Sequence, residues 1–207
     1  AKQLEGSGIM LRKERQQGVP TIEEYLKQTL KRGETLGFDG RCIMQDSAEK
    51  LITQLNTQGV AVHTDIDLAG AVWENRPELS SQPVWPLPVE YAGESSQSKI
   101  ERVREFLVEK KADYLLLTSL EDIAWLLNMR GNDVESTPVI LSYLLLGEKE
   151  LTWYVQEKCL SEKIKILLDM QGIKVAPYAQ IYEDARNLPE DAAVYYDKSA
   201  VNTALVS

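Results

Sequence analysis

The sequence predicts an α/β fold with a mixed sheet, tending toward α+β, built as two tandem units. Three observations predict this class: helical and strand-like segments alternate, capping signals open several helices, and two strand-like runs are joined by only a short polar turn. The chain has 207 residues, of which 43% are apolar. A chain of this length buries about 70% of its extended surface and forms one or two domains.

The helices are indicated by capping boxes, in which an N-cap side chain and an acid three residues later satisfy free backbone N–H groups. Four boxes are present: Thr21 with Glu24, Asp46 with Glu49, Ser98 with Glu101, and Ser119 with Asp122. Together with helical spacing of apolar residues, they predict helices over 21–30, 47–58, 98–110, 120–128, 161–172 and 179–188. A last helix is expected over 199–207.

Strands are predicted where apolar and β-branched residues run between turn signals. The predicted strands are 8–13, 35–39, 60–64, 112–118, 138–146, 150–156, 173–178 and 192–197. The runs 138–146 and 150–156 are joined by the polar stretch GEKE and form a β-hairpin candidate. The sheet is therefore expected to be mixed rather than purely parallel.

One linker is visible in the composition. Residues 76–97 contain four of the eight prolines and a Ser-rich tail, and proline removes backbone donors and fixes φ. We therefore expect a first domain over 1–76, a Pro/Ser-rich linker over 77–97, and a second domain over 98–207.

The two units repeat each other weakly. The matches pair Gly8-Ile9 with Gly172-Ile173, Pro20 with Pro177, Tyr25 with Tyr182, and Phe38-Asp39 with Tyr196-Asp197. Matches this short also arise by chance. If the duplication is real, we expect that the first unit lacks its front half and that the chain is a fragment. It would begin inside one domain and end in the helix predicted over 199–207, where another domain could follow.

Charge and cysteine content exclude several classes of protein. The formal net charge is -9 and no basic block is present, which argues against nucleic-acid partners and an anionic membrane surface. Cys42 and Cys159 are far apart, which suits two inert thiols in a reducing compartment. No apolar run reaches membrane-spanning length, and no signal-peptide core opens the chain. A cytoplasmic location is expected.

The sequence offers no catalytic centre of its own. His63 is the single histidine, and with Asp65 it could hold a metal, although alternation in a strand explains the same residues. No nucleophile lies in a recognisable Ser-His-Asp or Cys-His context, and no glycine-rich phosphate loop is present. We predict no catalytic residue and no metal ligand in this chain.

The polar group Arg130-Gly131-Asn132-Asp133 stands between two core-forming segments, and we call it the tetrad. One interpretation is a turn, in which Gly131 takes a positive φ and Arg130 pairs with Asp133. The other is a loop that presents a guanidinium fork and a carboxylate to a ligand or a neighbouring domain. Arg130, Asn132 and Asp133 are the candidate site residues.

The same region resembles a known family. The string DIAWLLNMRGNDV at 122–134, followed by Thr-Pro-Val and Ser-Tyr, is similar to the middle domain of three-domain aminopeptidase P, the Xaa-Pro aminopeptidases of the creatinase and prolidase family. Trp73, Arg76 and Pro77 form a W-x-x-R-P pattern that resembles the end of that family's first domain. Thr137 departs from the family, which commonly has Asn before this proline.

The resemblance implies two tandem creatinase-N-like domains, the first truncated at its N-terminus. It also implies a following pita-bread domain, in which two Asp, one His and two Glu bind two divalent metals, usually manganese. None of those ligands maps onto this chain. The intact protein would release the N-terminal residue before a penultimate proline, using a metal-bridged hydroxide.

The resemblance implies a noncatalytic role for this portion of the protein. It would restrict access to short proline-containing peptides, pack against its own C-terminal catalytic domain and support a homodimer, with the tetrad lining the substrate cleft. Two alternatives remain open. One is an inactive creatinase-like module that binds histones or other basic partners, which the acidic charge would suit. The other is an independent enzyme that uses the tetrad, which the lack of a nucleophile-base pair disfavours.

Overall fold

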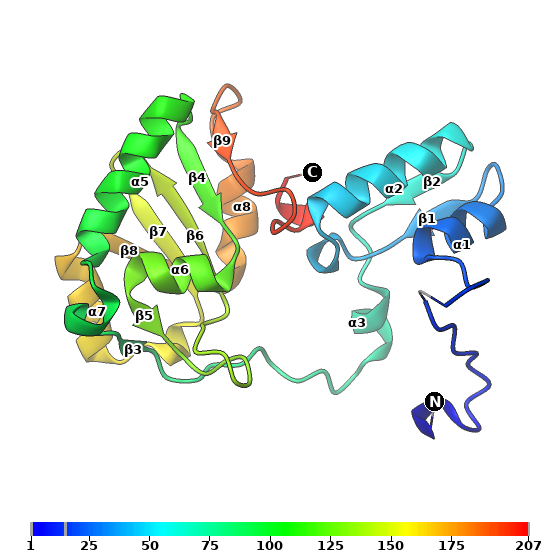
Figure 1. The fold of residues 1–207 in the computed structure, drawn as a ribbon, viewed down its shortest axis with the longest axis horizontal. Helices are drawn as coiled ribbons and strands as arrows, with labels where there is room; N and C mark the ends of the chain where they lie inside the picture. The colour runs from blue at the N-terminus through cyan, green and yellow to red at the C-terminus, as the bar shows by residue number, and fades with distance from the viewer. Residues whose placement is uncertain (1, 15, 207) are drawn as a thin grey trace.

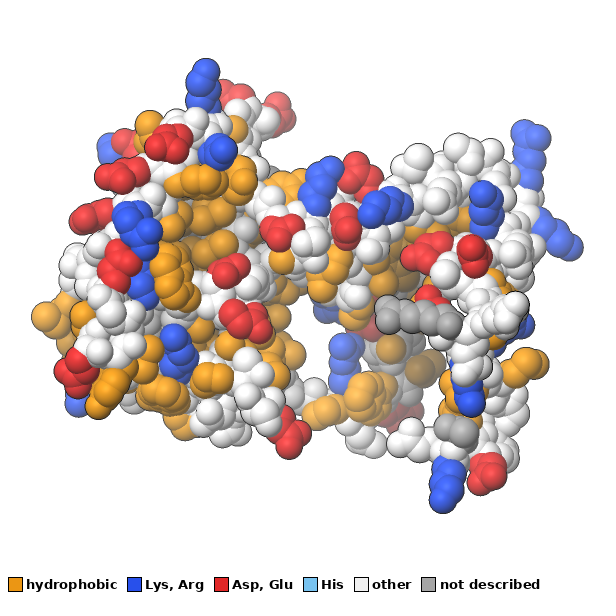
Figure 2. All heavy atoms as spheres, in the orientation of Figure 1, with side chains coloured by type: hydrophobic (Ala, Val, Ile, Leu, Met, Phe, Trp, Pro, Cys, Tyr) orange, Lys and Arg blue, Asp and Glu red, His pale blue; other side chains and the backbone are white. Residues whose placement is uncertain are grey.

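The structure is a computed structural model that describes residues 2–14 and 16–206. It has two lobes, which Figure 1 shows side by side. We call residues 2–76 the first lobe and residues 84–206 the second lobe. Figure 2 shows the lobes touching in the upper part of the view, with an opening between them below.

The first lobe is small and lightly packed. Its strands β1 (Thr35–Gly37) and β2 (Ala61–His63) pair in parallel. Its helices are α1 (Ile22–Thr29), α2 (Gln45–Thr57) and α3 (Leu68–Val72), with single 3₁₀ turns at Lys2–Leu4 and Gly40–Cys42. Its buried apolar side chains are those of Ala48, Leu55 and Val60. This lobe therefore has little core to stabilise it.

The second lobe is built on a five-stranded mixed sheet, as the sequence predicts. Its strand order is β8-β7-β6-β4-β9. The strands are β4 (Tyr114–Leu117), β6 (Ser142–Gly147), β7 (Leu151–Val155), β8 (Ile173–Pro177) and β9 (Val194–Tyr195). Strands β6 and β7 form the expected antiparallel hairpin, whereas β8 and β9 join the sheet in parallel.

Helices cover both faces of this sheet (Figure 1). They are α5 (Ser96–Lys110), α6 (Leu120–Leu127), α7 (Glu162–Met170) and α8 (Ile181–Arg186). Neighbouring residues of β4 show the two-sided packing, because Leu115 joins the core under α5, α6 and α7 while Leu116 joins the core under α8. Two separate cores give this lobe a three-layer architecture. No helix in the described ranges is both long and apolar enough to cross a membrane.

The predicted linker is partly structured. Strand β3 (Trp85–Pro86) and helix α4 (Val89–Ala92) lie inside it, and α5 begins at Ser96. Strand β3 pairs with β5 (Met129–Arg130) in a separate two-stranded sheet. Residues 73–84 have neither helix nor strand. The expected domain boundaries remain a prediction.

Two predicted elements are wrong. Residues 8–13 form no strand, because no other described segment offers their backbone a partner, and Met10 is 78% exposed. The expected helix over 199–207 is, within the described residues, a 3₁₀ turn at Thr203–Leu205. That segment packs against the first lobe instead, where the Thr203 N–H donates to the Ile43 carbonyl at 2.9 Å.

The capping predictions had mixed success. The Thr21–Glu24 box is present in both directions, and Ser119 caps α6 through the Asp122 N–H. The box at Ser98 is wrong, because α5 begins one turn earlier with Ser95 as its N-cap.

The box at Asp46 is also wrong, and contact between the lobes is the reason. The Gln45 and Asp46 N–H groups at the start of α2 donate to the Val201 and Lys198 carbonyls of the second lobe, at 2.9 and 3.1 Å. These long-range bonds satisfy the donors that a local cap would otherwise satisfy.

Candidate functional site

The tetrad follows a helix end that is fixed by a buried lysine. Asn128 ends α6 in the left-handed region, with φ of 53°. Lys99 is 2% exposed, and its Nζ donates to Asn128 Oδ1 at 2.7 Å and to the Trp125 carbonyl at 2.8 Å. Asn128 Nδ2 in turn donates to the Glu94 carbonyl. Burial lowers the pKa of the Lys99 ammonium, so this contact carries a desolvation cost.

The Arg130 side chain is anchored through one nitrogen of its guanidinium group. It lies in β5 opposite Trp85 of β3. Its Nη1 donates to the carbonyls of Ala124 and Met129. The described part of the chain gives Nε and Nη2 no partner, so these two donors are available to a ligand. Burial lowers the pKa of this guanidinium, which nevertheless stays charged at neutral pH.

Asp133 is used inside the protein. Its Oδ1 accepts from Ser80 Oγ at 2.6 Å and from the Gln82 N–H at 3.0 Å, and its Oδ2 accepts from the Leu141 N–H at 2.9 Å. The carboxylate therefore ties the chain between the lobes to the start of β6.

The remaining two tetrad residues play different parts. Gly131 is buried, and a Cβ there would lie 2.6 Å from Ile140 Cγ1, so the glycine is required for space. It does not take the positive φ that the turn interpretation expected. Asn132 is exposed, and within 2–14 and 16–206 its side chain has no hydrogen-bond partner.

The tetrad is therefore not a simple turn closed by an ion pair. Among the described residues Arg130 and Asp133 bond to other groups and not to each other. As far as the described residues show, Arg130 and Asn132 are the tetrad residues whose side chains keep polar atoms without a hydrogen-bond partner. Lys99, Ser80 and Gln82 support this loop but were missed, because they are far away in the sequence and belong to no motif.

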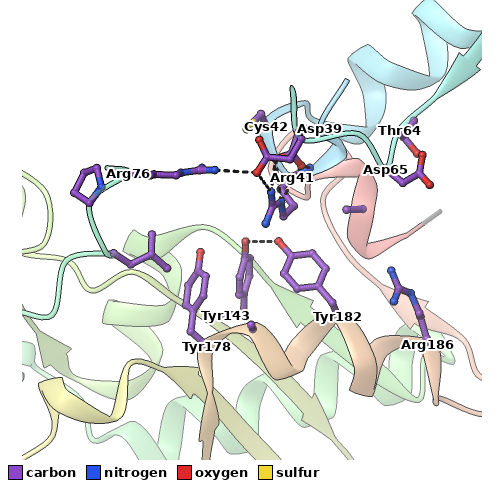
Figure 3. Close-up of a pocket in the computed structure, with 15 residues that line it drawn as sticks. Asp39, Arg41, Cys42, Thr64, Asp65, Arg76, Tyr143, Tyr178, Tyr182 and Arg186 are labelled. Carbon is purple, nitrogen blue, oxygen red and sulfur yellow. Dashed lines mark hydrogen bonds and ion pairs between the residues drawn. The ribbon is translucent and has the colours of Figure 1, made fainter. Parts of the chain in front are cut away.

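A second polar site lies between the lobes, and we call it the inter-lobe cleft (Figure 3). It encloses about 740 Å³. Its first-lobe wall carries the charged residues Asp39, Arg41, Asp65, Asp67 and Arg76. Its second-lobe wall carries Tyr143, Tyr178, Tyr182 and Arg186. No tetrad residue lines it.

An ion-pair network orders the first-lobe wall. Arg41 Nη2 lies 2.6 Å from Asp39 Oδ2 and 2.7 Å from Asp67 Oδ2, and Arg76 Nη1 lies 2.9 Å from the same Asp67 oxygen. The Arg41 guanidinium lowers the pKa of the Asp39 carboxyl. Arg76 belongs to the W-x-x-R-P pattern, so the sequence marked the segment without indicating its partner.

The implied dinuclear metal centre does not fit these residues. Across the described ranges, no three His, Cys, Asp or Glu side chains come together as metal ligands. His63 lies in β2 and is exposed.

Comparison with known proteins places the chain in a family. The family model described as the creatinase/prolidase N-terminal domain matches residues 75–207. A probable Xaa-Pro aminopeptidase P from Sordaria macrospora is 34% identical, and the match covers 100% of this chain and 34% of that protein. The Xaa-Pro aminopeptidase of Caenorhabditis elegans is 32% identical over 87% of this chain and 29% of its own length.

A solved structure agrees with these relatives. The X-prolyl aminopeptidase from Caenorhabditis elegans, a cytosolic enzyme with a di-nuclear active site, has a TM-score of 0.86 and 30% identity to this chain. The match covers 95% of this chain and 33% of that one. The chain thus spans about a third of the length of the relatives it matches. By sequence and by fold, the chain belongs to the creatinase/prolidase N-terminal domain family.

Proposed function

We propose that this chain is the noncatalytic N-terminal portion of a metal-dependent Xaa-Pro aminopeptidase. The intact enzyme would release the N-terminal residue before a penultimate proline, with two divalent metals, manganese in this proposal, held outside this chain. The similarity to Xaa-Pro aminopeptidases along the whole chain supports this proposal. We further propose that the enzyme is a cytoplasmic homodimer and that this portion restricts access to short peptides.

The proposed role of the tetrad in binding substrate rests on the guanidinium of Arg130, of which one nitrogen is hydrogen-bonded in the described structure. One nitrogen anchors the fork to two backbone carbonyls, while Nε and Nη2 have no partner among residues 2–14 and 16–206. A fork fixed in this way can donate to a carbonyl or a carboxylate of an extended peptide with little loss of side-chain entropy. Asp133 would position the loop, and Asn132 would add a second polar contact. In this proposal the tetrad faces the metal cleft of the intact enzyme.

The test is Arg130→Ala in the full-length enzyme, with kcat/KM measured on a Xaa-Pro-Xaa peptide. We expect a loss of tenfold or more, equivalent to about 1.4 kcal/mol, because a misplaced peptide reacts slowly. Losing the two carbonyl contacts also costs about 1 kcal/mol of stability, so the assay is run well below the melting temperature.

Arg104→Ala is the matched control, since Arg104 also donates to a backbone carbonyl, that of Gly147. It should lower the melting temperature without changing kcat/KM. An unchanged kcat/KM for Arg130→Ala would contradict the proposal that the tetrad lines the substrate cleft.

A further inference from the structure

The inter-lobe cleft has the dimensions and lining of a small-molecule site. Ligand sites in proteins enclose about 300–1,000 Å³ and combine apolar walls with a few placed polar groups. The cleft encloses about 740 Å³, and Leu79, Pro77 and Ala179 add apolar surface to its tyrosines and charges. It lies where two lobes meet, which is a common position for ligand sites.

Two opposite charges in the cleft remain unused. Asp39, Arg41, Asp67 and Arg76 neutralise one another in the ion-pair network described above. Asp65 and Arg186 form no ion pair within the described part of the chain, although both line the cleft. Figure 3 shows them on opposite walls at the same end, Asp65 from the first lobe and Arg186 from α8. Counting the described residues alone, the cleft therefore offers one free cation, Arg186, and one free anion, Asp65.

The tyrosine wall adds a hydrogen-bond donor. Asn202 is 5% exposed, and its Nδ2 donates to the hydroxyls of Tyr143 and Tyr182 at 3.1 and 3.2 Å. These two hydroxyls are 3.1 Å apart, so one donates to the other. Both hydroxyls accept from Asn202, and their mutual bond uses only one of their two protons. The second proton goes to an acceptor in the cleft or to Tyr178, which lines the same wall and then presents its own hydroxyl proton to the cleft.

We propose that the inter-lobe cleft binds a small zwitterion, an amino acid or a short peptide. Its carboxylate pairs with Arg186 and accepts from the spare tyrosine hydroxyl, and its ammonium pairs with Asp65. A nearly neutral site with separated charges favours a ligand that carries both charges over one that carries either alone. The inference does not rest on the proposed peptidase function, because the tetrad lies outside this cleft.

Trialanine is the probe, titrated into the 207-residue chain by calorimetry and by amide chemical shifts. We expect saturable binding, with shifts at residues 39–42, 64–67 and 178–186. Two blocked peptides separate the charges: N-acetyl-trialanine lacks the ammonium and trialanine amide lacks the carboxylate. Each should bind at least tenfold more weakly than trialanine.

Matched variants assign the charges. Arg186→Gln should weaken the binding of trialanine about tenfold. It should leave the weak binding of trialanine amide unchanged, because the amide has no carboxylate to pair with Arg186. Asp65→Asn should likewise weaken the binding of trialanine about tenfold. It should leave the binding of N-acetyl-trialanine unchanged, because that peptide has no ammonium to pair with Asp65. Glu183→Gln, on the same helix but outside the cleft, should have no effect. The inference is overturned if trialanine shows no saturable binding up to about 10 mM, or if the blocked peptides bind as well as trialanine.

Discussion

Asp133 is the residue of the tetrad on which the stability of the loop depends most. Its two oxygens accept three hydrogen bonds from groups at 80, 82 and 141. Asp133→Asn replaces one oxygen with an NH₂ group that cannot accept, so at least one donor loses its partner. We expect a loss of about 1–3 kcal/mol in the free energy of unfolding, measured by urea denaturation of this chain.

Asn132→Ala is the control for that measurement. Its exposed side chain has no partner in the described ranges, so the change should stay within about 0.5 kcal/mol. Equal stabilities of Asp133→Asn and the unchanged chain would show that Asp133 does not hold the loop. A change in kcat/KM for Asp133→Asn in the full-length enzyme would therefore reflect the displaced loop and not a contact between Asp133 and the substrate.

The sequence could predict which residues matter in the tetrad but not what they contact. A charged, turn-prone group between two core segments marked Arg130 and Asp133, and the suggested pairing of the two was wrong. Their true partners are backbone groups and a serine brought close by the fold. Lys99 gave no signal at all, because a lysine in a helix is normally solvated and only the packed structure buries it.

At the scale of elements, the N-cap of α5 differs from the one that the sequence predicts. The capping box predicted Ser98 as the N-cap, whereas the structure has Ser95 there. Ser95 Oγ accepts from the Ser98 N–H and caps the helix, whereas Ser98 Oγ donates to Glu94. We expect Ser95→Ala to cost about 1 kcal/mol and Ser98→Ala to cost less, measured by thermal unfolding of the two variants. A larger loss for Ser98→Ala would contradict this order and show that the bond from Ser98 to Glu94 stabilises the helix start more than the Ser95 cap does.

Elements whose pattern is local were predictable, and those completed by distant residues were not. The hairpin β6–β7 and helices α5 to α8 follow from periodicity and turn residues in the sequence. The start of α2 depends on carbonyls of residues 198 and 201, which no local pattern encodes. For the same reason the helix predicted over 199–207 is wrong, because the segment around Thr203 packs on the first lobe.

For the whole molecule, the two lobes should differ in stability. The second lobe has two hydrophobic cores, whereas the first lobe buries only a few apolar side chains. A protease specific for glutamate should cut at the exposed Glu74, near the end of the first lobe, or at the exposed Glu78 between the lobes. We expect the C-terminal piece to survive and the N-terminal piece to be digested further, as followed by mass spectrometry. Survival of the N-terminal piece alone would contradict this order of stability.

The central claim is that this chain supports an aminopeptidase without holding its catalytic centre. The most direct test is to assay the purified chain on Xaa-Pro-Xaa peptides with added Mn²⁺ and to measure bound metal after dialysis. The described residues group no three metal-ligating side chains, so we predict no turnover and no stoichiometric divalent metal. Turnover that a chelator abolishes and Mn²⁺ restores would contradict the claim, because it would place a working metal centre within these 207 residues.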